Sequence, residues 1–127
     1  MAASSTSGIN NSTFTNADFS PTANFDLFMK AALYAKTNDI PVKAGNVLSA
    51  DKFYEDDAHS YKKWSEYGVL CVEMEAAGLY TIAAKHNVKA LAILTISDSL
   101  VTMEKTTADE RETTFNTMVD IALNTLV

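Results

Sequence analysis

Cysteine, arginine and proline are scarce: the sequence has one, one and two of them among 127 residues. Because a disulfide needs two cysteines, Cys71 cannot form one within the chain, which fits a reducing compartment such as the cytoplasm. No apolar run approaches the roughly 18 residues that a membrane helix requires, so we expect no membrane partner. Residues 1–24 contain no Lys or Arg, which argues against a secretory signal.

Positive charge is scarce as well. Ten basic residues stand against sixteen acids, and the net charge is −6. This balance argues against nucleic acid or an anionic membrane surface as the main partner. His59 and His86 are isolated, with no second ligand at a metal-binding spacing, so we expect no metal site.

The length is sufficient for one domain with a core and too short for two of ordinary size. We therefore take residues 1–127 as part of a single domain. Residues 1–23 are rich in Ser, Thr and Asn, which predicts a polar, loop-rich leader. Ile9, Phe14 and Phe19 indicate that part of this leader packs against the rest.

Two long segments have helical periodicity. Residues 24–38 predict an amphipathic helix, and residues 106–127 predict a second one that begins with a capping box of Thr107 and Glu110. The inward residues expected from the spacing are Phe25, Phe28, Ala32 and Ala35 in the first helix, and Phe115, Met118, Val119, Ala122 and Leu126 in the second.

Two shorter helices are predicted between them. Residues 58–68 favour a short exposed helix closed by Gly68, and residues 74–87 favour a helix that is apolar nearly all round and therefore buried. Apolar runs at 42–48, 69–72 and 88–97 predict strands. The run at 69–72 is typical of a strand buried on both faces, and the run at 88–97 is the strongest of the three. Strands that alternate with helices indicate an α/β fold with a mainly parallel sheet.

Polar side chains gather where these strands end. In parallel sheets, ligands bind beyond the carboxyl ends of the strands. The candidates at these positions are Asp51, Glu73, Glu75, Ser97 and Asp98.

Glu73 and Glu75 lie two residues apart at the junction of a strand and a helix. One interpretation is structural: one acid caps the helix and the other is solvated. The other is that both accept hydrogen bonds from neutral ligand hydroxyls, such as those of a sugar. Met74 between them is either a filler or an apolar floor under that sugar.

Asp98 ends the 88–97 run and is either a turn residue or a proton donor. Arg111 stands four residues before Phe115, which predicts that it faces inward and needs a carboxylate partner. Asp98 with Arg111 would form either a structural salt bridge or a proton donor with a tuning charge. Phe53 either packs in the core or contacts a flat ligand, and Cys71 is either an inert thiol or a nucleophile.

Three segments together resemble a known family: NVLSADKFY (46–54), VLCVEMEAAGLYTIAAKHNVKALAILTISDS (69–99) and EKTTADERETTFNTMVDIAL (104–123). They are similar to the carboxyl-terminal half of bacterial hexameric purine-nucleoside phosphorylases. The resemblance implies the nucleoside phosphorylase fold, with a mixed sheet flanked by helices. It also implies cleavage of purine nucleosides by orthophosphate to give a free base and ribose 1-phosphate, with phosphate as co-substrate and no cofactor.

The resemblance also implies roles for individual residues. Asp98 would protonate N7 of the purine as the glycosidic bond breaks, with Arg111 assisting after a shift of its helix start. Glu75 would accept from the ribose hydroxyls. The remaining contacts to base and ribose would come from Phe53, Val72, Glu73, Met74 and Ser97. Ser99 stands where some relatives have His, which leaves the preferred base open.

The resemblance further implies that one part of the family's site is absent. Its phosphate-binding arginines and Gly-rich loop belong to an amino-terminal half that these residues do not match, so we expect a fragment of a homo-oligomer that is hexameric when intact. One alternative is a methylthioadenosine/adenosylhomocysteine nucleosidase of the same fold, which uses water instead of phosphate. Another is a non-catalytic purine-binding or assembly module.

Overall fold

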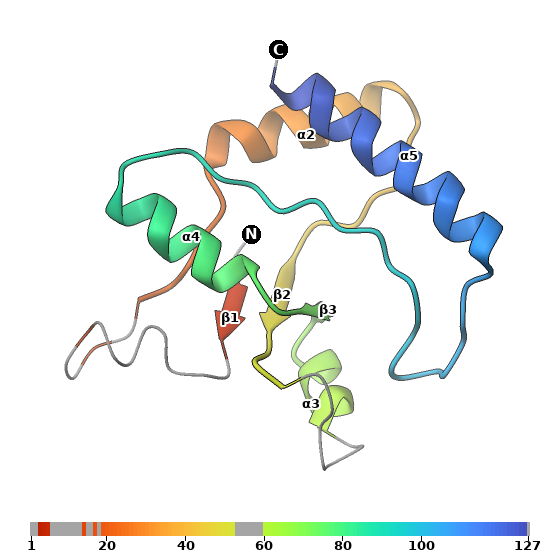
Figure 1. Cartoon of the computed structure of the whole chain (residues 1–127), viewed down its shortest axis with the longest axis horizontal. Coiled ribbons are helices and arrows are strands. Elements are labelled where there is room, and N and C mark those ends of the chain that lie inside the picture. Colours follow the sequence, from red (N-terminus) through yellow and green to blue (C-terminus); the bar gives the residue numbers. More distant parts are fainter. Residues whose placement is uncertain (1–2, 6–13, 15–16, 18, 53–59, 127) are drawn as a thin grey trace.

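The computed structural model describes residues 3–5, 14, 17, 19–52 and 60–126 (Figure 1). The strands β1, β2 and β3 form one parallel sheet in the order β1-β2-β3. Helices flank this sheet, so the predicted α/β class is confirmed. The elements are β1 (Ala3–Ser5), α2 (Phe25–Thr37), β2 (Asn46–Ser49), α3 (Ser60–Glu66), β3 (Val69–Glu73), α4 (Ala76–Lys85) and α5 (Ala108–Thr125).

Helix α2 forms where the periodicity predicted it. The Asn24 side chain caps the helix by accepting from the Leu27 N–H at 3.1 Å. Asp26 in the first turn pairs with Lys89 at 2.7 Å. Ala35 is fully buried, but the expectation for Phe25 is wrong: its side chain is 71% exposed. Phe25 is the first residue of α2, and the turns that follow make the contact with the core.

The predicted strand at 42–48 is shorter than expected and is displaced along the chain. Residues 41–44 are exposed and lie outside the sheet, and β2 begins at Asn46.

Strand β3 confirms the strand at 69–72, but not its burial on both faces, because Leu70 is 44% exposed. Among the described residues β3 is an edge strand, so it has a neighbouring strand on one side only. Gly68, with φ at +76°, closes α3 just before it, as predicted.

The core lies between α4 and the sheet. Ala76 and Ala77 at the start of α4 are almost completely buried against Val47 of β2, together with Tyr80. The small alanines let the helix backbone approach the strand closely. The prediction that α4 is buried all round is wrong, because Leu79 and Ile82 are on an exposed face.

The segment 88–97 is not a strand, contrary to the strongest strand prediction. It runs without regular structure between α4 and the pair formed by α2 and α5 (Figure 1). A strand exists only where neighbouring backbone supplies hydrogen bonds. Here the Ala92 N–H donates to the Tyr80 hydroxyl at 2.9 Å instead, and the Ala90 carbonyl accepts from the Asn24 N–H at 2.8 Å.

Helix α5 begins with the predicted capping box, in which Thr107 and Glu110 each satisfy a backbone N–H of the other. Its carboxyl-terminal half packs on α2, where the Tyr34 hydroxyl donates to Asp120 at 2.8 Å. Ile121 and Thr125 are the buried residues of α5, and the predicted inward residues Phe115 and Leu126 are exposed. The first half of α5 extends past α2 (Figure 1), and Phe115 is 54% exposed. None of the helices in the described part is long and apolar enough to span a bilayer.

We expect Tyr80→Phe to lower the free energy of unfolding by about 1–3 kcal/mol, because the half-buried Ala92 N–H would lose its acceptor. Tyr80 is 3% exposed, so water cannot readily replace its hydroxyl. Urea denaturation followed by circular dichroism measures the change. Tyr67→Phe is the matched control, since Tyr67 is 77% exposed, and an equal loss in both variants would contradict this role of Tyr80.

Candidate functional site

A cleft of about 740 Å³ opens where β2, β3 and the segment 88–97 end. Five of the predicted site residues line it: Val72, Glu73, Met74, Ser97 and Asp98. Two residues that are far apart in the sequence, Glu73 and Asp98, therefore border one space. Glu75 and Arg111 are not among the lining residues, and Phe53 lies outside the described residues.

Glu73 is held by the chain itself. One oxygen of its carboxylate accepts from the backbone N–H groups of Glu75 at 2.8 Å and Ala76 at 2.6 Å. Its other oxygen accepts from the Ser49 hydroxyl, whose oxygen in turn accepts from the Ala77 N–H at 2.8 Å. These N–H groups are the unpaired donors at the start of α4, where negative charge is favourable. Glu73 is thus the acid that caps the helix.

Glu75 is in a different environment. Its side chain is exposed and makes one long hydrogen bond, in which its carboxylate accepts from the Met74 N–H at 3.3 Å. Most of its acceptor capacity is available to solvent or to a ligand. The structure therefore separates the two acids as the structural interpretation predicted, with one capping and one solvated, and leaves Glu75 able to bind hydroxyls.

Asp98 lies at the base of a closed loop. An antiparallel bridge joins it to Lys105, the Ser99 N–H donates to the Glu104 carbonyl at 2.8 Å, and the Thr106 N–H donates to the Ser97 carbonyl at 3.1 Å. These backbone bonds fix the turn at the mouth of the cleft. The carboxylate of Asp98 itself is exposed and makes no hydrogen bond to any described residue.

The expected pair of Asp98 and Arg111 is not formed. Both side chains are exposed, and no ion pair joins them in the described part of the chain. Arg111 stands in the first turn of α5, and its part of the helix projects beyond the core together with Phe115. The expectation of an inward Arg111 is wrong for this reason, and its assistance to Asp98 stays a prediction from the resemblance.

The residues that line the cleft include Lys52, Tyr61 and Trp64, for which the sequence predicted no binding role. Ser49, which was not predicted either, contributes as the partner of Glu73. Tyr61 and Trp64 stand three residues apart on α3, a spacing that puts both rings on one side of a helix. The three-residue spacing could have predicted this aromatic surface from the sequence. An aromatic surface beside a predicted ligand site suits a flat ligand.

Cys71 also borders the cleft, and burial raises the pKa of its thiol, with a further contribution from the charge of Glu73. A raised pKa disfavours the reactive thiolate, which agrees with the interpretation of Cys71 as an inert thiol. Among the described residues no group of three His, Cys, Asp or Glu side chains is placed to hold a metal ion.

Comparison with known proteins identifies the class of this chain. The family model described as the phosphorylase superfamily matches residues 2–126. The chain therefore belongs to the phosphorylase superfamily.

Comparison with individual relatives gives a more specific resemblance than the family model does. The chain is 54% identical over 127 residues to a DeoD-type purine nucleoside phosphorylase of Exiguobacterium sibiricum, covering 100% of this chain and 54% of that protein. It is 55% identical over 123 residues to a DeoD-type purine nucleoside phosphorylase of Clostridium novyi, covering 97% of this chain and 53% of that protein. The chain thus spans about half the length of the curated relatives it matches.

A solved structure supports the fold independently. The purine nucleoside phosphorylase of Toxoplasma gondii, in complex with immucillin-H, matches with a TM-score of 0.80 at 20% identity. The match covers 98% of this chain and 52% of that one. The predicted partial nucleoside phosphorylase fold is confirmed.

We expect Glu73→Ala to lower the free energy of unfolding by about 1–3 kcal/mol, because two backbone N–H groups at the start of α4 lose their acceptor. The Ser49 hydroxyl loses its acceptor in the same variant. Glu75→Ala is the matched control and should change stability by less than about 0.5 kcal/mol, as exposed sites usually do. Urea denaturation measures both, and a larger loss for the Glu75 variant would contradict the assignment of Glu73 as the cap.

Proposed function

We propose that this chain provides the purine- and ribose-binding part of a purine-nucleoside phosphorylase. The reaction converts a purine nucleoside and phosphate into a purine base and ribose 1-phosphate. One observation supports this most: Glu73 and Met74 border the same cleft as Ser97 and Asp98 in a chain of the phosphorylase superfamily. The curated relatives at 54–55% identity are named for this activity.

Asp98 is the proposed general acid. When the glycosidic bond breaks, the base leaves with the bonding electrons, and a proton delivered to N7 neutralises the charge that develops on it. Proton transfer from a positioned side chain speeds such steps by about 10²–10⁴-fold. The exposed Asp98 carboxylate at the mouth of the cleft is free of intramolecular hydrogen bonds from described residues, so a ligand can approach it.

The sugar is proposed to lie near the start of α4. Glu75 keeps its carboxylate available there, and hydroxyl groups of ribose are neutral donors that match an acceptor-only group. Glu73 supports this arrangement indirectly, by holding the turn through Met74 that presents Glu75. Tyr61 and Trp64 add an aromatic wall that suits a purine ring.

Phosphate is proposed as co-substrate, but we do not assign its binding to Asp98, Glu75, Tyr61 or Trp64. Anions of this kind are commonly bound by several arginines or a Gly-rich loop, and Arg111 is the single arginine of the sequence. We propose that the phosphate site comes from the part of the relatives that this chain does not span. No cofactor is needed for the proposed chemistry. We also propose a cytoplasmic homo-oligomer, in keeping with the unpaired thiol and the family resemblance.

A nucleosidase of the same fold is the second candidate for the reaction. It would use water in place of phosphate, with the same acid and the same sugar contact. The names of the relatives favour the phosphorylase.

Asp98→Asn should lower phosphorolysis of inosine by at least about 10²-fold, because the amide cannot donate the proton to N7. The test uses this chain fused to the half of the Exiguobacterium sibiricum relative that it does not match, with release of hypoxanthine as the readout. Asp39→Asn is the matched control, because Asp39 is remote from the cleft and its φ of +53° suits Asn. Activity of the Asp98→Asn fusion equal to that of the parent would reject Asp98 as the acid.

The 127-residue chain alone should show no phosphate-dependent cleavage of inosine or adenosine. Positioning of the attacking group contributes several kcal/mol to catalysis, and the described residues offer no cluster of arginines for it. Chromatography of the reaction products with and without phosphate measures this, with the fusion as positive control. Rapid phosphorolysis by the chain alone would contradict the assignment, and phosphate-independent cleavage by the fusion would favour the nucleosidase.

A further inference from the structure

Ser99 follows Asp98 in the lining of the cleft, and the surrounding loop binds it through three hydrogen bonds. Its N–H donates to the Glu104 carbonyl at 2.8 Å, and its carbonyl accepts from the Met103 N–H at 2.9 Å. Its hydroxyl oxygen accepts from the Thr102 N–H at 3.0 Å. Because the backbone and the side chain are both held by the loop, the hydroxyl has a fixed position at the cleft.

The bond from Thr102 determines which hydrogen bond the Ser99 hydroxyl offers to a ligand. A serine hydroxyl has one hydrogen to donate and two lone pairs that accept. The Thr102 N–H occupies one lone pair, while the hydroxyl donates to no described residue. Its hydrogen is therefore available, and its capacity to accept is reduced. Ser97, on the other side of Asp98, has a hydroxyl that bonds to no described residue and can donate or accept equally well.

A purine presents two neighbouring groups to such a pair of residues. N7 and the substituent at C6 lie on the same edge of the ring system. In a 6-oxopurine both groups accept hydrogen bonds, whereas in adenine the substituent at C6 is an amino group that donates. Since Asp98 is the proposed donor to N7, the side chain that meets the C6 substituent must lie next to Asp98 in the cleft, and Ser99 does.

We propose that the Ser99 hydroxyl donates a hydrogen bond to the oxygen at C6, so that the preferred substrates are 6-oxopurine nucleosides and not 6-aminopurine nucleosides. This inference rests on the proposed function, because it takes Asp98 as the partner of N7. An amino group at C6 would place a donor against a donor, and polar groups that stay unpaired in a complex weaken it.

The test compares inosine with adenosine in the fusion of this chain to the half of the Exiguobacterium sibiricum relative that it does not match. The measured quantity is the ratio of kcat/KM for the two nucleosides. This ratio does not depend on the amount of folded enzyme, or on changes at Asp98 that affect both substrates alike. We expect the parent fusion to favour inosine by at least about fivefold, and Ser99→Ala to lower the ratio by about threefold to tenfold, the effect of one neutral hydrogen bond.

Ser99→Asp separates the donor to the ligand from the bond within the loop. Its carboxylate can still accept from the Thr102 N–H, but it offers only acceptors to a purine. We therefore expect this variant to favour adenosine.

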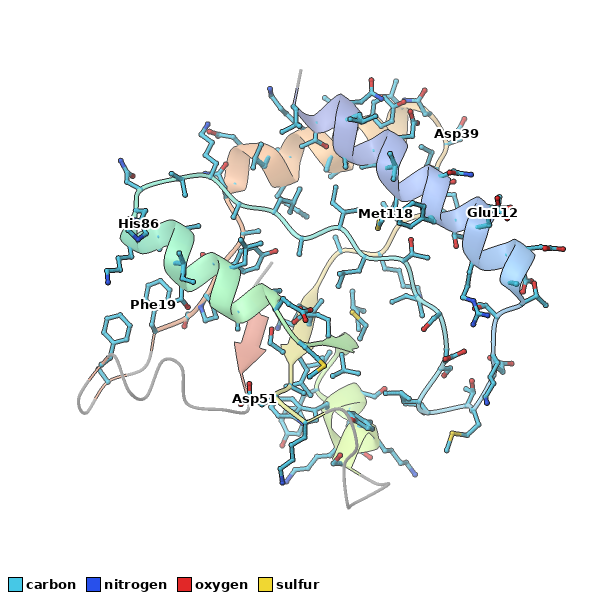
Figure 2. The ribbon with its side chains drawn as sticks, viewed as in Figure 1. Phe19, Asp39, Asp51, His86, Glu112 and Met118 are labelled. Carbon is cyan, nitrogen blue, oxygen red and sulfur yellow. The ribbon has the colours of Figure 1, made fainter. Side chains whose placement is uncertain are left out.

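Two controls accompany these variants. Ser97→Ala removes the same hydroxyl from the other neighbour of Asp98 and should change the ratio by less than about twofold, even if both rates fall. Asp39→Asn is the remote control, because Asp39 lies beyond the end of α2, on the opposite side of the molecule from α3, which borders the cleft (Figure 2). It should leave both rates unchanged.

Four results would each overturn the inference. They are a parent fusion that cleaves adenosine at least as well as inosine, a Ser99→Ala variant with the ratio of the parent, a Ser99→Asp variant that favours inosine as strongly as the parent, and a Ser97→Ala variant whose ratio falls as far as that of Ser99→Ala.

Absence of cleavage of both nucleosides would reject the proposed function, and binding of the free bases to the same fusion, measured by equilibrium dialysis, would then decide the inference. Hypoxanthine bound at least about threefold more tightly than adenine, with the difference lost in Ser99→Ala, would support it. Equal binding of the two bases, or no binding of either, would overturn it.

Discussion

The hydrogen bonds between Glu73, Ser49 and the start of α4 hold the described sheet and its helix together. Ser49 ends β2, Glu73 ends β3, and the N–H groups of Ala76 and Ala77 begin α4, so three elements meet at two side chains. A carboxylate at this position satisfies donors that no helix can satisfy internally, and its charge suits the positive end of the helix dipole. The close packing of Ala76 and Ala77 on β2 depends on the same junction.

This junction also explains why the sequence has two acids so close together. Glu73 already accepts three hydrogen bonds from described residues, whereas Glu75 accepts one. With Glu73 engaged, the turn through Met74 is held in place, and the carboxylate of Glu75, which is not among the residues that line the cleft, stays exposed. The pair thus divides into a structural acid and an acid whose carboxylate stays exposed. The same division applies at Asp98, where backbone bonds around the loop carry the structural role and leave the carboxylate exposed.

The sequence predicted local features well and burial poorly. Caps and turns depend on a few neighbouring residues, so Asn24, Gly68 and the box of Thr107 and Glu110 were predictable. The rule for parallel sheets predicted that Glu73 and Asp98 meet, and both line one cleft although residues 88–97 form no strand in the structure. Expectations about inward residues, including Phe115 and Arg111, failed because periodicity shows which side of a helix is apolar and not what covers it.

The failed burial predictions share one physical origin. Leu70, Ile82, Leu94, Ile96 and Phe115 are all between about two fifths and about three fifths exposed, although their patterns are those of residues in a complete core. The chain spans about half the length of the curated relatives that it matches. A side chain is buried only where other elements cover it, and among the described residues the sheet has three strands with β3 at one edge. Periodicity and apolar runs are therefore properties of a segment by itself, whereas burial depends on neighbours that the described part of the chain does not supply at these five positions.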